Sequence, residues 1–218
     1  MSDRKNLPPI ESRSVTCEVR TEGQGGNIII GKPIVYGSYT DMGWYREIIE
    51  RGALDMADIS DVRFLVNHDI SAIPLARART ANGKSTMQLT VDDTGMTVKV
   101  ELDTERNEQA RALYSAVERG DISGMSFMFS VKSNEWEDID TDYPTRRITQ
   151  IGSVIEVSAV NFPAYAATEI YARDSKNALE SAKQSLENAK QERAKEKRSA
   201  EADELTLLKE KTKILGGI

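Results

Sequence analysis

The sequence predicts an α+β protein that is mainly β, with a small barrel-like core, a few helices and a charged C-terminal tail that is helical or disordered. Segments with period-two alternation of apolar and polar residues recur before Arg173, and turn signals separate them. Near Arg173 the composition changes sharply. We therefore expect a flexible N-terminus at 1–11, a folded domain at 12–173 and a tail at 174–218.

The strands of the expected core alternate clearly between apolar and polar residues, at Val62–Val66, Met87–Val91, Met96–Leu102 and Val154–Val160. Hairpin-type turn signals stand at Asn82-Gly83 and at Asp93-Thr94-Gly95. Strands joined in this way form a meander or a small barrel.

One helix is predicted from about Glu105 to Arg119, because apolar residues recur there at helical spacing. Thr104 is its expected N-cap, and Gly120 is suited to end it. A second, short helix is expected over all or part of 46–51, before Gly52.

The tail contains no aromatic residue and no proline, and its ten basic and nine acidic residues are mixed in sign. Leu179, Ala182, Leu186 and Ala189 fall at heptad positions, but the pattern breaks at Arg193. Two heptads fit either a single exposed helix or a weak self-association helix. We expect the tail to be dispensable for the fold and to serve delivery into an assembly.

The composition excludes several classes of function. The chain has 218 residues, a mass of 24.2 kDa and a net charge of -6, so its charge repels a phosphate backbone. No apolar run approaches the roughly 20 residues that span a membrane, and the N-terminus lacks the features of a secretory signal. One cysteine, Cys17, and one histidine, His68, cannot build a zinc site of the usual kind. We expect no cofactor, no nucleic acid partner and no membrane partner.

Three residues are candidates for chemistry. Ser126 alternates with the apolar Met125 and Phe127, so it belongs to the opposite face of a strand. A serine hydroxyl needs a base, and the only histidine is His68, at the end of a predicted strand. Taken alone, His68 fits a hydrogen-bonded histidine at the rim of the domain, and serines on polar strand faces are common.

The imidazole of His68 would also need a group that orients it. Asp69 is badly placed, because neighbouring residues of an extended chain point to opposite faces. Glu156 lies inside an apolar strand, where a carboxylate usually has a partner. That partner is either His68 or an arginine such as Arg147 or Arg77, and the spacing leaves both open.

These segments, in this order, resemble the prohead maturation proteases of tailed bacteriophages, serine peptidases related to the herpesvirus assemblin clan. The matching pieces cover about 27–173 and are Glu47–Leu54, Asn67–Asp69, Gly120 with Gly124–Phe127, and Glu156–Val160 followed by Phe162–Ala164. The resemblance implies a β-barrel-like core in a protease domain at 12–173, with Ser126 as nucleophile and His68 as general base. The assemblin relatives use a second histidine as the third member. This sequence has none, which makes Glu156 the substitute.

The resemblance also implies a serine endopeptidase that acts in the host cytoplasm, inside the immature capsid. Its partners would be the major capsid protein and the scaffold, which it cleaves together with itself; self-association through the tail stays open. The alternative is a non-catalytic assembly or scaffolding protein on the same fold. An esterase of the α/β-hydrolase kind is disfavoured, because no serine stands in a Gly-x-Ser-x-Gly elbow.

Overall fold

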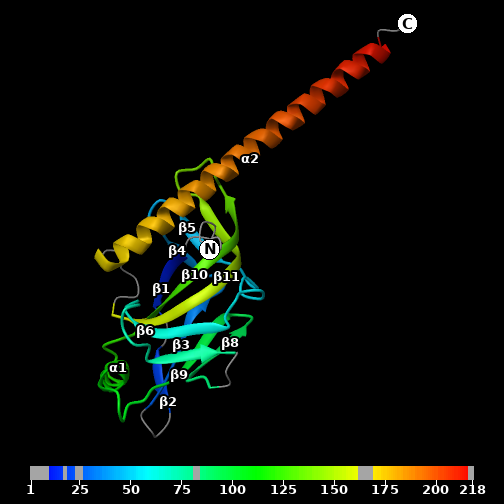
Figure 1. The fold of residues 1–218 in the computed structure, drawn as a ribbon. Coiled ribbons are helices and arrows are strands. Elements are labelled where there is room, and N and C mark those ends of the chain that lie inside the picture. The colour runs from blue at the N-terminus through cyan, green and yellow to red at the C-terminus, as the bar shows by residue number, and fades with distance from the viewer. Residues whose placement is uncertain (1–9, 17–18, 23–26, 81–83, 162–168, 216–218) are drawn as a thin grey trace, which may run out of the picture.

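The computed structural model describes the chain except for residues 1–9, 17–18, 23–26, 81–83, 162–168 and 216–218 (Figure 1). The turn signal at Asn82-Gly83 and the Phe162–Ala164 piece lie outside the described residues. In chain order the elements are β1 Ile10–Thr16, β2 Arg20–Glu22, β3 Ile28–Val35, β4 Tyr39–Asp41, β5 Arg46–Ile49, β6 Asp61–Val66, β7 Ala76–Arg79, β8 Met87–Asp92, β9 Gly95–Glu101, α1 Glu108–Glu118, β10 Gly124–Glu137, β11 Thr145–Val160 and α2 Glu169–Leu215.

The strands form two sheets. One has seven strands, in the order β1-β10-β11-β5-β4, with β6 added to β11 and β7 to β6. The other has four antiparallel strands, in the order β2-β3-β9-β8. The α+β, mainly β class is thus confirmed. Over the described residues the two sheets do not close into a barrel.

The core lies between the two sheets and α1. Its members include Phe127 and Phe129 from β10, Val98 from β9 and Ile29 from β3, all fully buried. Met125 of β10 packs so closely on Gly31 that a Cβ there would come within 2.6 Å of its side chain. The predicted apolar face of β10 therefore does point into the core, and it fixes which way the opposite face is turned.

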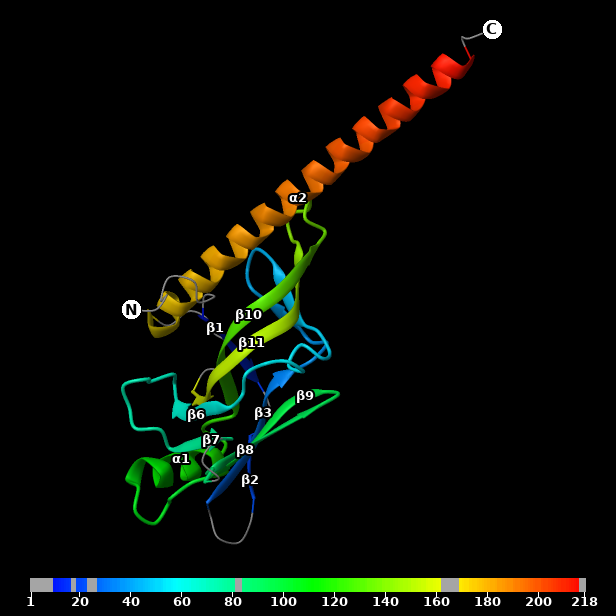
Figure 2. The ribbon, with the colours of Figure 1, turned by 45° about the vertical axis from the view of Figure 1, so that its right-hand side comes forward.

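The long strand β11 holds the site's elements together. Along one edge it pairs with β10, antiparallel; along the other it pairs in parallel with β5 through its first residues and with β6 through its last. Figure 2 shows β10 and β11 running together past β6 toward α2. The C-terminal ends of β6 and β11 consequently lie next to each other.

Two helix predictions are wrong, one about the existence of a helix and one about where a helix begins. The segment 46–51 does not form a helix, because residues 46–49 pair as β5 with both β4 and β11, where the β-branched Ile48 and Ile49 fit a pleated, buried surface. Helix α1 begins three residues later than expected. Its N-cap is Asn107, whose side chain accepts from the backbone N–H groups of Gln109 and Ala110, while Asp103 and Asn107 close a turn that precedes it.

Other sequence expectations at the element level are confirmed. Helix α1 buries Ala110, Leu113 and Val117, and Gly120 follows it with a φ of 79°. Gly95 ends the β8–β9 turn with a φ of 138°, where a Cβ would collide with the backbone of Ile34.

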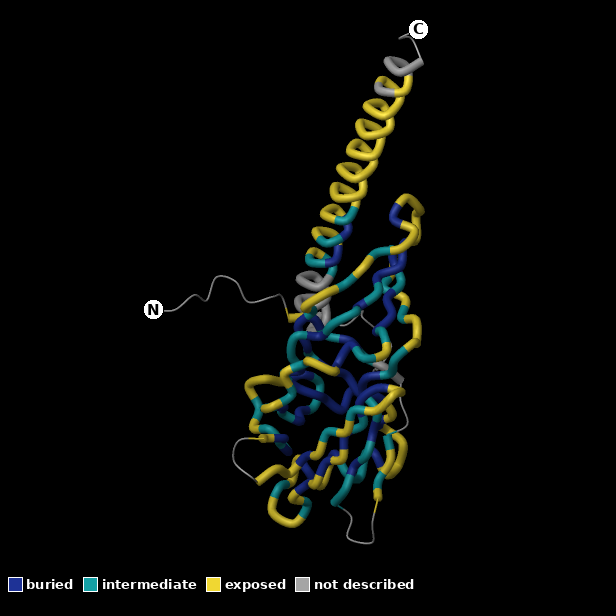
Figure 3. The backbone as a smooth tube through the Cα atoms, turned by 90° about the vertical axis from the view of Figure 1, so that its right-hand side faces the viewer, coloured by how far each residue is buried: buried dark blue, intermediate teal, exposed yellow. Residues whose placement is uncertain are grey.

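The tail is one continuous helix, α2, whose 47 residues begin before the composition change, so the expected boundary at Arg173 falls inside it. Figure 3 shows its distal part exposed on all sides and a buried stretch where it passes the sheet. Ala182 and Leu186 are buried there. At the other end, Ile10 and Glu11, expected in a flexible N-terminus, belong to β1. Neither helix of the described chain has an apolar stretch that could cross a membrane.

Candidate active site

The three candidate residues come from three elements and meet in one hydrogen-bonded series. His68 follows β6, Ser126 lies on β10 and Glu156 lies on β11. The Nε2 atom of His68 is 2.5 Å from Ser126 Oγ, and its Nδ1 atom bonds Glu156 Oε1. All three side chains are buried. The structure therefore joins the residues that the sequence singled out separately.

Strand register explains why Ser126 and Glu156 share a face. Ser126 lies directly opposite Ser158 in the β10–β11 ladder, and Glu156 precedes Ser158 by two residues. On the other edge of β11, Val66 of β6 pairs with Ala159. The chain that leaves β6 thus emerges beside the same face.

A left-handed turn then directs His68 back over the sheet. Asn67 and His68 have φ values of 50° and 57°, a region that non-glycine residues rarely occupy. Backbone contacts hold the turn, since Asn67 N donates to Ala159 O at 3.0 Å and the Asn67 side chain accepts from Asn161 N at 3.1 Å. Such strain persists only where the surroundings fix it, and it is often found at functional sites.

Among the residues that the structure describes, no arginine pairs with Glu156. Arg77 pairs instead with Asp61, and Arg147 pairs with Glu50 and Glu137. The second carboxylate oxygen of Glu156, Oε2, accepts from Ser158 Oγ at 2.6 Å. Of the two partners that the sequence left open for Glu156, the structure places His68 against it.

Asp69 lies away from this series. Its exposed carboxylate accepts from the backbone N–H of Ser71 at 3.0 Å and from the Ser71 hydroxyl at 2.5 Å. It therefore caps the turn after His68 and does not orient the imidazole.

Ser126 has an exposed fraction of 0%, and in the β1–β10 ladder it lies opposite Ser14 of β1. Its Oγ lies 2.8 Å from the carbonyl oxygen of Arg13 and 3.0 Å from the hydroxyl of Ser14, which donates to it. A serine has one hydroxyl proton, so the carbonyl of Arg13 and Nε2 of His68 compete for it. In this arrangement the hydroxyl of Ser126 is closed off from solvent.

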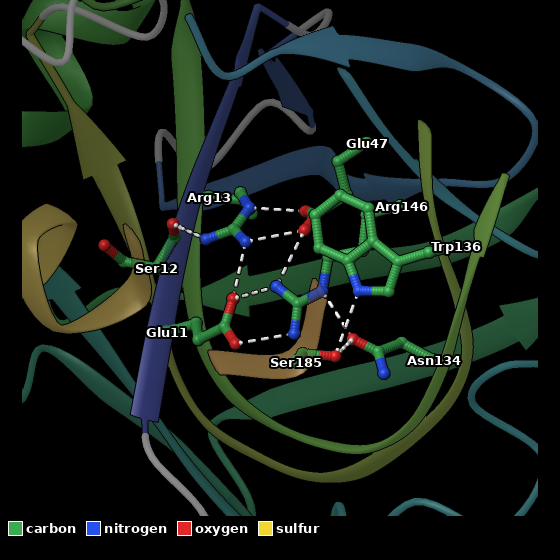
Figure 4. A network of polar contacts seen from close by, with 8 residues as sticks. All are labelled: Glu11, Ser12, Arg13, Glu47, Asn134, Trp136, Arg146 and Ser185. Atoms are coloured by element: carbon green, nitrogen blue, oxygen red, sulfur yellow. Dashed lines mark hydrogen bonds and ion pairs between the residues drawn. The ribbon is translucent and has the colours of Figure 1, made fainter. Parts of the chain in front are cut away.

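A buried ion network holds β1 in place (Figure 4). We call Glu11, Arg13, Glu47 and Arg146 the β1 ion network. The Arg13 guanidinium donates two hydrogen bonds to the Glu47 carboxylate, at 2.5 and 2.8 Å. Arg146 donates two to the Glu11 carboxylate, at 2.9 and 3.0 Å. Burial alone would raise the pKa of Glu11, but the two guanidinium groups outweigh it and hold that pKa below the ordinary value. The network joins β1 to β5 and β11 and contains two charges of each sign.

A pocket of about 770 Å³ lies next to His68. His68 lines it together with apolar residues of the loop after β6 and of α1, including Ile70, Ile73, Leu75 and Leu113. Ile70 and Ile73 are exposed at its rim. An apolar hollow beside a base is suited to receive an apolar side chain.

Two features of the site were missed by the sequence analysis. The role of Ser158 had a partial signal, because alternation puts it on the face of Glu156, but nothing named its partners. The contacts of Ser126 with β1 had no signal, because only the pairing of β1 with β10 reveals them.

One family model matches most of the chain. The family model of the caudovirus prohead serine proteases matches residues 15–185. The chain belongs to this family. The matched range of this prohead protease family member contains Ser126, His68 and Glu156, and it begins within β1.

Other comparisons add little. Among curated proteins, none matches the chain. One solved structure that it resembles is that of the bacteriophage T4 capsid assembly protease gp21, at 12% identity and a TM-score of 0.42, covering 72% of this chain and 100% of that one.

Proposed function

We propose that this family member is a serine endopeptidase that cleaves scaffold protein, capsid protein and itself inside the prohead during capsid maturation. The observation that carries the proposal is the continuous series from Glu156 through His68 to Ser126. Membership of a prohead protease family supports the choice of capsid and scaffold proteins as substrates and of the prohead, within the host cytoplasm, as the place of action.

The geometry suits acyl transfer through a serine ester. Ser126 Oγ would attack the scissile carbonyl carbon while His68 Nε2 accepts its proton. Collapse of the tetrahedral intermediate breaks the C–N bond, and the same Nε2 returns the proton to the leaving amine. Water then attacks the ester, with His68 again as base, and frees Ser126. Throughout, Glu156 would keep the proton of the neutral imidazole on Nδ1, so that Nε2 faces the serine.

The alternative, a non-catalytic assembly or scaffolding protein, is favoured by one observation. Most of α2 beyond Arg193 is exposed and polar, as a docking helix would be. The two functions differ in whether the intact site breaks peptide bonds.

The test is co-expression of the chain with the capsid and scaffold proteins of its phage, followed by mass spectrometry of the products. Ser126→Ala removes one hydroxyl and keeps the β10 ladder, so we expect a folded protein and no processing. Ser133→Ala, an exposed serine on the same strand, is the matched control and should process normally. Equal processing by Ser126→Ala would refute the assignment of the nucleophile. No processing by any form would favour the assembly role.

A further inference from the structure

Ser158 bonds two parts of the site, the backbone of the turn at His68 and the carboxylate of Glu156. Its hydroxyl accepts from the backbone N–H of His68 at 3.0 Å and donates to Glu156 Oε2 at 2.6 Å. Its exposed fraction is 0%. One buried hydroxyl therefore ties the left-handed turn that carries the imidazole to the carboxylate that faces it.

The direction of both bonds is fixed by chemistry. A backbone N–H can only donate and an ionised carboxylate can only accept, so the Ser158 proton must point at Glu156. With Oε2 held in this way, the carboxylate cannot rotate freely, and Oε1 is presented to Nδ1 of His68. The other bond gives the buried N–H of His68 a partner at a residue whose backbone is in the left-handed region.

We propose that Ser158 is a positioning residue of the protease site, which sets the orientation of Glu156 and of the His68 turn together. Only the expected effect on kcat rests on the proposed function. We place Ser158 outside the reacting atoms, because the bonds of its hydroxyl are to the His68 backbone and to Glu156. Its effect would be on how long the imidazole spends in the productive tautomer and orientation.

The test compares Ser158→Ala with Ser158→Thr, which keeps the hydroxyl. The matched control is Ser153→Ala, since Ser153 lies on the same strand and also has a hydroxyl bond, to Ser130 at 2.9 Å. Cleavage of a soluble peptide substrate gives kcat and KM. Loss of a hydrogen bond to a charged group should lower kcat of Ser158→Ala about ten- to hundredfold, with KM within about twofold. Ser158→Thr should recover most of the loss, and Ser153→Ala should show none.

A second readout does not depend on activity. His68 is the only histidine of the chain, so the imidazole signals in a ¹⁵N-histidine NMR spectrum need no assignment. We expect the folded protein to show a proton on Nδ1 with a low-field resonance, and Ser158→Ala to shift or lose that resonance. A purely structural role would lower stability and leave the spectrum of the folded fraction unchanged.

The outcomes separate the two proposals. An unchanged imidazole spectrum together with a kcat within threefold in folded Ser158→Ala overturns the positioning role. A changed spectrum in a chain that cleaves nothing supports the positioning role and counts against the proposed function alone. If Ser158→Ala does not fold, Ser158→Cys, whose thiol is a poor donor, takes its place with the same expected results.

Discussion

Glu156 has different partners on its two carboxylate oxygens, His68 on one side and Ser158 on the other. Both contacts lie in a strand whose buried residues are otherwise mostly apolar, such as Val154, Val157 and Ala159. A carboxylate kept in such surroundings is costly unless its bonds are satisfied. Under the proposed function, the contribution of this carboxylate is the orientation that it gives to the imidazole.

This explanation predicts a large effect of Glu156→Gln on catalysis. The amide can present its N–H₂ group to Nδ1, which favours the wrong imidazole tautomer, so we expect kcat to fall by about 10⁴, as in the serine-protease template. Steady-state kinetics on a peptide substrate measure it. Glu135→Gln, at an exposed position of β10, is the control. A loss below about tenfold would mean that Glu156 acts as a structural group.

Much of the candidate site could be predicted from the residue types and from the alternation of apolar and polar residues. A single histidine left one candidate base, and period two put Ser126 opposite the apolar face of β10. Alternation cannot say what lies across a ladder, because pairing joins residues far apart in the chain. That is why the choice between His68 and an arginine for Glu156, and the burial of Ser126, needed the structure.

Among the elements, β1 has the largest consequence for the site, because it is an edge strand that pairs with β10 and contacts the hydroxyl of Ser126. Two charged residues of β1, Glu11 and Arg13, hold the strand in position. They form ion pairs with Glu47 of β5 and Arg146 of β11. Such buried pairs are sensitive to loss of one partner, which leaves the other charge without compensation.

The β1 ion network predicts a specific loss of stability in acid. The pKa of Glu11 is lower in the folded state than its ordinary value of 4.5, so its contribution is complete above that pH and is lost as the pH falls through the folded pKa. We expect the free energy of unfolding, measured by urea titration, to decline below about pH 4.5.

Two variants isolate this effect. Glu11→Gln should be less stable at pH 7 by about 3–5 kcal/mol, and its stability should depend less on pH in the acid range. Glu22→Gln, which removes an exposed partner of Lys99, should behave like the unmodified chain. An acid dependence of Glu11→Gln equal to that of the unmodified chain would contradict the role given to Glu11.

The alternation of apolar and polar residues predicted the strands of the β8–β9 hairpin well, because the turn residues between them agree with it. It failed at 46–51, where a short mixed segment has no clear period and pairing with β4 and β11 decides the conformation. It also mislocated the start of α1, because both Thr104 and Asn107 are acceptable caps and the preceding turn selects the second.

For the whole molecule, the contact between α2 and the sheet changes the expectation that the tail is dispensable for the fold. Trp136 Nε1 donates to Ser185 Oγ at 3.0 Å, Arg193 pairs with Asp140 at 3.0 Å, and Leu186 is buried. Leucines occur both in this buried stretch and in the exposed part of the tail, so the sequence alone did not show which part contacts the sheet. Position along the sheet, which composition does not encode, makes the difference.

We therefore expect two truncations to differ. Ending the chain after Arg173 removes the buried stretch, which is worth roughly 2 kcal/mol or more for Leu186 alone, and should lower Tm by about 4 °C or more. Ending it after Glu196 should leave Tm unchanged. Differential scanning calorimetry measures both, with Leu186→Ala and Leu207→Ala in the full chain as buried and exposed controls. Equal Tm values for the two truncations would show that the contact adds no stability.

The length of α2 also limits what a single molecule can do to itself. Arg193 of the helix pairs with Asp140, which lies between β10 and β11. From Arg193 to its end at Leu215 the helix rises about 33 Å away from the β domain (Figure 2). A straight helix cannot fold back to place its far end over its own Ser126. Under the proposed activity, a cut in this distal part of one molecule must therefore be made by the active site of a second molecule. Loss of the distal part should thus follow second-order kinetics in a dilution series, slow in a dilute extract and fast where many copies share one small volume.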